Sequence, residues 1–172
     1  MSRAGPIASS RGAAGRAVGR RHARPRPLIL AAIDLGPATR PVVAAAVRLA
    51  RRSVGRLLLL HVVPPDPVEL HGPAVARRMI RGMLGVIHRR ERRRLRAVAA
   101  ATGLPRGRVE WRFLDGDPAE VILAAARALR PACIVVAGRG HGAVFNLFVG
   151  STAQRLLRRA TCPVVIVPVR RR

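Results

Sequence analysis

The stretch LILAAIDLGPATRPVVAAAVRLARRSVGRLLLLHVV, residues 28–63, decides the fold. It begins and ends with continuous apolar runs, 28–34 and 56–63, which are typical of strands buried on both faces. Between them, residues 39–54 carry apolar side chains at helical spacing, and Gly55 ends that helix. Strand, helix and strand in this order predict two parallel strands joined by a right-handed crossover. The stretch is therefore the first unit of an α/β domain.

The rest of the chain continues the same alternation. The predicted elements are a long helix over 74–102, a strand over 109–116, a helix over 118–129, a strand over 132–138, a helix over 151–160 and a strand over 162–169. The helix at 118 has a strong start signal, because Asp117 and Glu120 form a capping box around a proline. This order predicts an α/β, doubly wound, five-stranded parallel sheet with helices on both faces.

The charge of the chain is extreme. Its 172 residues include 33 Arg, no Lys and 8 acids, for a formal charge of +25, and 49% of the residues are hydrophobic. Residues 1–27 hold seven Arg and no acid, which predicts a disordered Arg-rich tail before a domain at 28–169 and a basic end at 170–172. A solvated arm is favoured for the tail, with a transit peptide or an over-extended gene start as alternatives.

Several classes of protein are excluded by what is missing. No apolar run reaches the ~18 residues of a spanning helix, so we expect no integral membrane protein and no membrane partner. Without lysine, P-loop and Schiff-base mechanisms are excluded. The charge suggests nucleic acid or anionic membrane, but an arginine coding bias explains it better. Nucleic acid stays an unfavoured alternative, because stacking aromatics are scarce.

The ends of the predicted strands show where a ligand would bind. In doubly wound sheets, ligands lie beyond the carboxyl ends of the strands, where strand order reverses. The fourth strand ends in Gly138-Arg139-Gly140, and Gly150-Ser151-Thr152 opens the next helix. Glycines allow phosphate oxygens to approach backbone N–H groups, and a helix N-terminus favours anions. Ser151 and Thr152 either cap this helix or donate their hydroxyls to the anion.

The stretch GRGHGAVFNLFVGSTAQRLLRRATCPVVIV, residues 138–167, resembles the carboxyl-terminal signature of the universal stress protein family. Nucleotide-binding members of that family carry Gly-x2-Gly-x9-Gly-Ser/Thr, then a helix and a CPV-type strand, and Gly140, Gly150 and Ser151 match this spacing. The segments AAID, PVVAAAVRLA and LLLLHVV of the first half are similar to the family too. The resemblance covers about 27–168 and implies the strand order 3-2-1-4-5.

The resemblance also implies a binding site for ATP or a related adenine nucleotide, with or without Mg²⁺. Asp34 would bond the nucleoside, and Ala32 and Val62 would pack near the base. The ribose and phosphates would be held by Gly140, Gly150, Ser151 and Thr152.

One position departs from the family pattern. Ala137 stands where the family has its first glycine, and Gly138 is expected to supply that flexibility one residue later. A member that has lost nucleotide binding therefore stays an alternative.

The implied function is a small cytoplasmic regulatory module of the stress response that forms a homodimer through residues 163–169. Nucleotide binding is favoured over catalysis, because no residue supplies a general base poised over the γ-phosphate. The alternatives are a slow ATPase, in which Asp34 or His141 orients water, and a nucleic-acid-associated basic protein. His61 is expected to be a structural histidine, His88 a surface residue, and both cysteines inert thiols.

Overall fold

A computed structural model describes residues 26–66, 73–140 and 150–170. The strands are β1 (Leu28–Ala32), β2 (Arg56–Val63), β3 (Val109–Asp115), β4 (Cys133–Gly140) and β5 (Val164–Arg170). The helices are α1 (Thr39–Arg52), α3 (Ala74–Ala100), α4 (Pro118–Leu129) and α5 (Ser151–Arg159). The predicted Arg-rich tail lies outside the described residues, apart from its last two.

The strands form one parallel five-stranded sheet in the order β3-β2-β1-β4-β5. This confirms the predicted fold class and the strand order implied by the family resemblance. Beyond the first strand, the chain builds outward through β2 and β3 and then returns to the other side of β1 with β4 and β5. The strand order therefore reverses between β1 and β4, which opens a crevice at the carboxyl ends of these strands.

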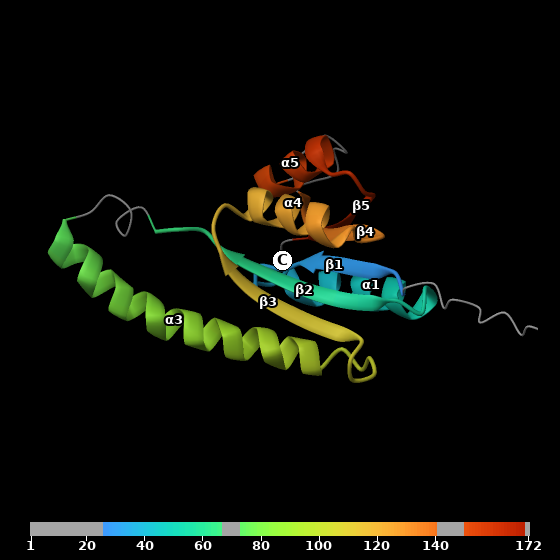
Figure 1. Cartoon of the computed structure of the whole chain (residues 1–172), viewed down its shortest axis with the longest axis horizontal. Helices are drawn as coiled ribbons and strands as arrows, with labels where there is room; N and C mark the ends of the chain where they lie inside the picture. Colours follow the sequence, from blue (N-terminus) through green and yellow to red (C-terminus); the bar gives the residue numbers. More distant parts are fainter. Residues whose placement is uncertain (1–25, 67–72, 141–149, 171–172) are drawn as a thin grey trace, which may run out of the picture.

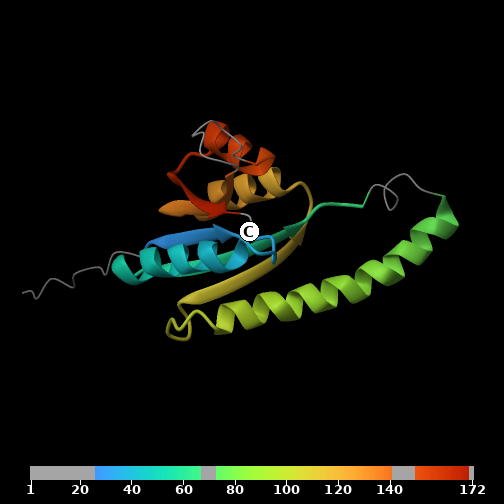
Figure 2. The same cartoon turned by 180° about the vertical axis from the view of Figure 1, so that it is seen from behind.

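The sheet has a hydrophobic core on each face, because the side chains of a strand alternate between faces. In β2, Leu57 and Leu59 pack with α1 and with Leu95 of α3, whereas Leu58 and Leu60 pack with α4 and α5. All four of these leucines are buried. Figures 1 and 2 show the two layers of helices on opposite faces, as the continuous apolar strands predict.

Helix α3 is longer than the sheet that it covers. Its 27 residues span roughly 40 Å at 1.5 Å per residue, whereas the seven residues of β3 span about 24 Å. Leu95, near its C-terminal end, is fully buried. The N-terminal half extends past the strands (Figure 1), and there Met79 and Met83 are exposed.

The ends of two strands differ from the sequence prediction by two residues each. β1 ends at Ala32, although the Ile33 N–H still donates to the Leu60 carbonyl at 3.0 Å. β4 continues to Gly140, which pairs with Arg170 of β5. Gly140, expected beyond the strand, therefore belongs to the strand itself. Pairing with β5 decides this, because isolated strand propensity does not favour glycine.

Helices α4 and α5 are tied together by ion pairs. The Asp117 carboxylate accepts the Glu120 N–H at 2.9 Å, as a capping box requires, and Arg155 donates to both carboxylates. The hydrogen bond from the Glu120 backbone N–H, and to a smaller extent the one from Arg155, hold the pKa of Asp117 below its usual value. Hydrogen bonds from Arg159, and to a smaller extent from Arg155, lower the pKa of Glu120. These contacts fix α5 beside α4 and with it the position of the α5 N-terminus.

Candidate functional site

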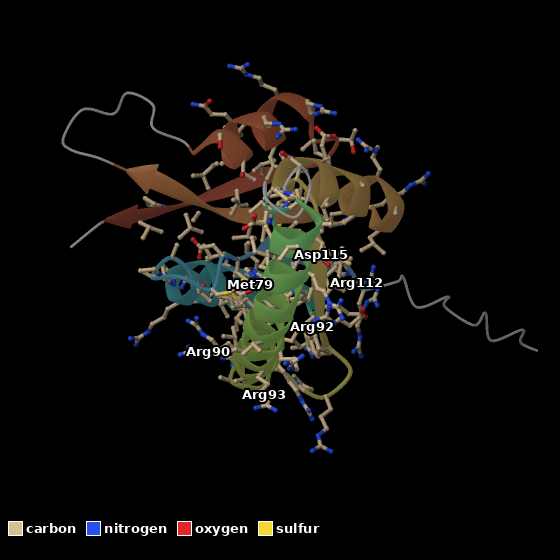
Figure 3. All side chains as sticks on the ribbon, turned by 90° about the vertical axis from the view of Figure 1, so that its left-hand side faces the viewer. Met79, Arg90, Arg92, Arg93, Arg112 and Asp115 are labelled. Atoms are coloured by element: carbon tan, nitrogen blue, oxygen red, sulfur yellow. The ribbon has the colours of Figure 1, made fainter. Side chains whose placement is uncertain are left out.

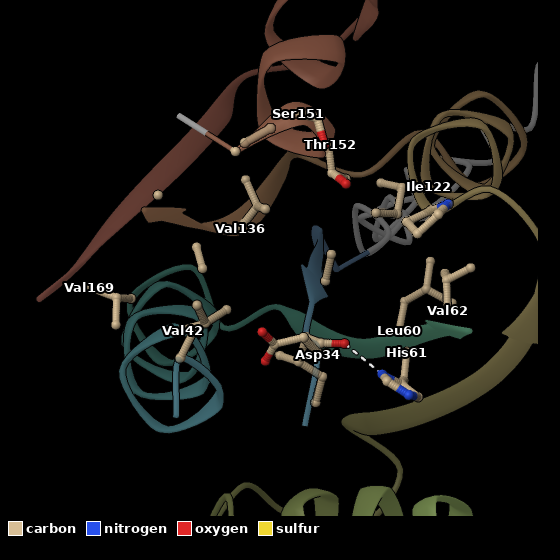
Figure 4. A pocket seen from close by; sticks show the side chains of 18 of the residues that line it. Asp34, Val42, Leu60, His61, Val62, Ile122, Val136, Ser151, Thr152 and Val169 are labelled. Atoms are coloured by element: carbon tan, nitrogen blue, oxygen red, sulfur yellow. Dashed lines mark hydrogen bonds between the residues drawn. The ribbon is translucent and has the colours of Figure 1, made fainter. Parts of the chain in front are cut away.

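A cavity of about 630 Å³ lies at the carboxyl ends of β1, β2 and β4 and at the N-terminus of α5 (Figure 4). Its volume is within the ~300–1,000 Å³ of small-molecule sites. Seven of the eight site residues named from the sequence line it: Ala32, Asp34, Val62, Gly138, Gly150, Ser151 and Thr152. Gly140, the eighth, is the last residue of β4. The cavity occupies the crevice that the reversal of strand order creates.

Asp34 is held in place at the end of β1. Its Oδ1 accepts the N–H of Gly36 at 2.9 Å and the hydroxyl of Thr39 at 3.4 Å. The turn between these residues places Leu35 at φ 57°, a left-handed conformation that costs a non-glycine residue some free energy. Within the part of the chain that the structure describes, no hydrogen bond to Oδ2 is found. The carboxylate is therefore oriented by its first oxygen, with the second free to accept from a ligand.

The wall on the α4 side of the cavity is apolar. Leu60 and Val62 come from β2, Val136 comes from β4, and Ile122 comes from α4 (Figure 4). All four side chains are buried in the second hydrophobic core. Such a wall favours a flat, weakly polar group of a ligand, whose transfer from water is driven by the hydrophobic effect.

The opposite rim is formed by the start of α5. Gly150 is the N-cap residue, and no side chain accepts a hydrogen bond there. The first bond of the helix runs from the Gln154 N–H to the Gly150 carbonyl, so the N–H groups of residues 151–153 have no acceptor within the helix. The sequence predicted that Ser151 and Thr152 either cap this helix or donate to an anion. The capping role is wrong, because Gly150 is the N-cap residue and no side chain caps the helix. N–H groups without a partner in the helix, together with the helix dipole, favour an anion at such a rim.

The backbone at Ala137 and Gly138 does not need the flexibility that the family pattern suggests for this region. Ala137 pairs regularly with Val167 and is not among the residues with positive φ, so alanine fits this backbone without strain. A Cβ on Gly138 would lie 2.5 Å from Cγ2 of Ile166. The expectation that Gly138 supplies backbone flexibility is therefore wrong. Glycine is needed there because β5 packs too closely for a side chain.

Two polar residues of the cavity were not singled out as site residues. His61 is buried, and its Nδ1 donates to the Ile33 carbonyl at 2.8 Å, as expected for a structural histidine. Its Nε2 lies 3.8 Å from Oε2 of Glu91, and both side chains line the cavity. Glu91 is the one acid in the run RRERRRLR. This isolated acid is the sequence feature that could have indicated its special position. The expectation of a surface position for His88 is wrong, because its half-buried ring packs on Phe113.

Arg94 connects the long helix to the same region. Its guanidinium donates to the Leu35 carbonyl at 2.7 Å, next to Asp34. The segment that carries Asp34 is therefore held from both sides, by Thr39 of α1 and by Arg94 of α3. This contact fixes one edge of the cavity to the packed half of α3.

The remaining candidate groups do not add a reactive centre. Burial raises the pKa of Cys133 and of Cys162, so both thiols stay protonated at neutral pH, as expected for inert cysteines. Among residues 26–66, 73–140 and 150–170, no group of three or more His, Cys, Asp and Glu side chains could hold a metal ion. His141, named as a water-orienting residue, lies outside the described residues.

None of the described helices combines the length and the apolar character that crossing a membrane requires.

Comparison with known proteins identifies relatives along most of the chain. The model of the universal stress protein family matches residues 27–168. The universal stress protein in the QAH/OAS sulfhydrylase 3' region of Thermus aquaticus is 37% identical over 139 residues, which are 81% of this chain and 96% of the relative. Universal stress protein A homolog 1 of Coxiella burnetii is 30% identical over 139 residues, covering 81% and 94%.

Solved structures share the fold. A universal stress family protein of Burkholderia pseudomallei is 26% identical, with a TM-score of 0.60, over 83% of this chain and 96% of its own. The universal stress protein of Archaeoglobus fulgidus in complex with dAMP has a TM-score of 0.56 at 17% identity, covering 83% and 97%. A universal stress protein in complex with cAMP has a TM-score of 0.54 at 21% identity, covering 82% and 95%. With a family model that matches residues 27–168 and two relatives that are at least 30% identical over most of their length, this chain belongs to the universal stress protein family.

Proposed function

We propose that this protein is a small cytoplasmic regulatory module of the stress response that binds ATP or a related adenine nucleotide. The observation that carries the proposal is the composition of one cavity: an apolar wall, a fixed carboxylate and an uncapped helix N-terminus surround the same space. These three parts suit the base, the sugar and the phosphates of a nucleotide. Structural neighbours in complex with dAMP and with cAMP support an adenine nucleotide as the ligand class.

The base is assigned to the apolar side of the cavity. Ala32 is the last residue of β1, Val62 is the last but one of the neighbouring strand β2, and Ile122 of α4 lines the same space. Burying a flat ring there removes apolar surface from water on both partners. Asp34 would accept from the ribose hydroxyls through Oδ2, because its Oδ1 is already bonded to Gly36 and Thr39.

The phosphates are assigned to the α5 rim. The N–H groups of Ser151 and Thr152 and their hydroxyls offer donors to phosphate oxygens, and the helix dipole adds favourable charge. Gly140, at the end of β4, is assigned to the phosphates by the family pattern. Mg²⁺, when present, would be held chiefly by the phosphates and water, since the two acids of the cavity lining are Asp34, assigned to the ribose, and Glu91, beside His61.

The proposal is tested by identifying the ligand and then weakening its sugar contact. Mass spectrometry of small molecules released from the denatured, purified protein is expected to show an adenine nucleotide. In calorimetry, Asp34→Ala should weaken adenosine and AMP binding by about tenfold, since a charged hydrogen bond is lost. The substitution should weaken pyrophosphate binding less, because the Asp34 carboxylate repels phosphate.

Ala137→Gly is the matched control for this measurement. It lies in the same cavity lining but needs no special backbone conformation, so the affinity should stay near that of the wild type. If both the wild type and Ala137→Gly fail to bind ATP at millimolar concentration, the chain is a family member without nucleotide binding and the proposal fails.

We also propose a homodimer through residues 163–169. β5 is an edge strand of the sheet, and an unpaired edge is normally covered. Its side chains Val165 and Val167 remain half-buried in the single chain. Val165→Arg or Val167→Arg should give a folded monomer by light scattering, while wild type is a dimer at micromolar concentration. A monomeric wild type contradicts this prediction.

A further inference from the structure

The overhanging half of α3 carries an apolar stripe that nothing in the described chain covers. Val75, Met79, Met83 and Val86 are spaced by four, four and three residues and so lie on one face of the helix. Their exposed fractions are 82%, 71%, 59% and 59%. Together with Ile87, they make up five of the nine large hydrophobic residues that are exposed in the described parts. Exposed apolar surface gathered in this way marks an interaction site.

The same helix is strongly cationic. Residues 74–100 contain nine arginines, and their one acid, Glu91, is turned toward the buried His61. Arg89, Arg90 and Arg93 line a groove with Val86 where the stripe meets the packed half of the helix. Figure 3, which looks along α3, shows Arg90 and Arg93 on its outer side. The exposed face is therefore apolar in its first half and positive where it continues.

The overhanging half gains little stability from its own sequence. Gly82 and Gly85 each cost about 1 kcal/mol relative to alanine inside a helix. The N-cap residue Pro73 makes no side-chain cap, and the first turn contains no acid. Most helical stability in proteins comes from burying one face, and in this half Ile80 and Leu84 are only partly buried. A surface that accepts the stripe would supply further burial.

Charge decides among the surfaces that could cover the stripe. A second copy docked on this face would bring the arginines of its own α3 against those of the first. Nucleic acid would attract the arginines but leaves methionine and valine side chains without an apolar acceptor. An anionic lipid bilayer offers both negative headgroups and an apolar boundary, which suits a helix with an apolar face and flanking arginines.

We propose that the N-terminal half of α3 docks in the plane of an anionic lipid bilayer, with Val75, Met79, Met83 and Val86 inserted at the headgroup boundary. Arg89, Arg90 and Arg93 hold the lipid phosphates, and their aliphatic stems cover the edge of the stripe. The expectation of no membrane partner rested on the lack of a spanning segment, and surface docking does not need one. The nucleotide cavity lies on the packed part of the domain and stays open.

Vesicle flotation with the purified full chain tests the proposal. Wild type should float with vesicles of equal parts phosphatidylglycerol and phosphatidylcholine and stay behind with phosphatidylcholine alone. Met79→Asp with Met83→Asp should lower binding more than about tenfold, because two apolar side chains are removed from the boundary. The matched control, Val54→Asp with Leu157→Asp, makes the same change at exposed residues elsewhere and should bind like wild type.

A second set of variants tests the arginines. Arg89→Gln, Arg90→Gln and Arg93→Gln together should lower binding and weaken its dependence on salt, whereas Arg48→Gln, Arg52→Gln and Arg127→Gln remove equal charge elsewhere and should have less effect. The fluorescence of Trp111, the one tryptophan, reports whether each variant is folded. Equal binding to neutral vesicles, or full binding by the Met79→Asp/Met83→Asp variant, overturns the proposal. Binding to duplex DNA in preference to vesicles, unaffected by that variant, would identify a nucleic-acid surface instead.

Discussion

Gly150→Val is expected to lower the affinity for adenine nucleotide by more than about 100-fold. Gly150 lines the cavity at the N-terminus of α5, where the proposed site brings a phosphate close to the backbone. A branched side chain there occupies the space of the phosphate and shields the N–H groups of the first helical turn. The loss is larger than for removal of a single hydroxyl, because every contact at the rim is affected.

The fold should survive this substitution. The backbone at Gly150 has φ −52° and ψ 155°, which any L-residue adopts readily. Valine is a poor N-cap residue, so the melting temperature should fall by about 2–4 °C, corresponding to ~1 kcal/mol. Calorimetry with ATP measures the affinity, and thermal unfolding measures the stability.

Gly82→Val is the matched control for Gly150→Val. Gly82 is exposed, and a Cβ there would meet nothing within 4 Å, so this variant should bind nucleotide like wild type. Nucleotide binding by Gly150→Val at wild-type strength would place the phosphates elsewhere and invalidate the proposed site.

Gly138→Ala is expected to destabilise the fold by about 2 kcal/mol, or roughly 4–8 °C in melting temperature. The added Cβ would lie 2.5 Å from Cγ2 of Ile166, closer than two non-bonded carbon atoms can approach. Ile166 is β-branched and packs, partly buried, against the second hydrophobic core, so it cannot rotate away freely. The strands β4 and β5 must separate locally, which weakens the edge of the sheet.

A double-mutant cycle isolates this clash. In an Ile166→Ala background, Gly138→Ala should cost less than about 0.5 kcal/mol, because the opposing methyl group is gone. Chemical unfolding followed by Trp111 fluorescence gives each free energy. Gly82→Ala is the control, and it should be neutral or stabilising because alanine favours an exposed helix. Equal costs for Gly138→Ala in both backgrounds would show that Ile166 is not the cause.

Much of this protein is determined by local sequence. The continuous apolar runs at 28–34 and 56–63 and the helical period between them specify a buried parallel sheet, since such strands need covering on both faces. The capping box at Asp117 gives the start of α4, because its hydrogen bonds involve neighbours within one turn. The family pattern around Gly150 predicted residues that line the cavity for a related reason. Neighbouring residues of one short segment form the helix N-terminus, so their spacing in the sequence determines which groups lie there.

Tertiary structure decided whatever depends on contacts between distant segments. The approach of Ile166 explains Gly138, and the 3.8 Å separation from Glu91 brings His61 into a polar pair at the cavity. The position of the sheet determines which apolar residues of α3 are buried. Leu95 lies in the core, whereas Met79, about 160° around the helix from Leu95 at 100° per residue, is exposed. A periodic pattern shows where a helix carries apolar residues, but only the neighbouring elements determine which of them are covered.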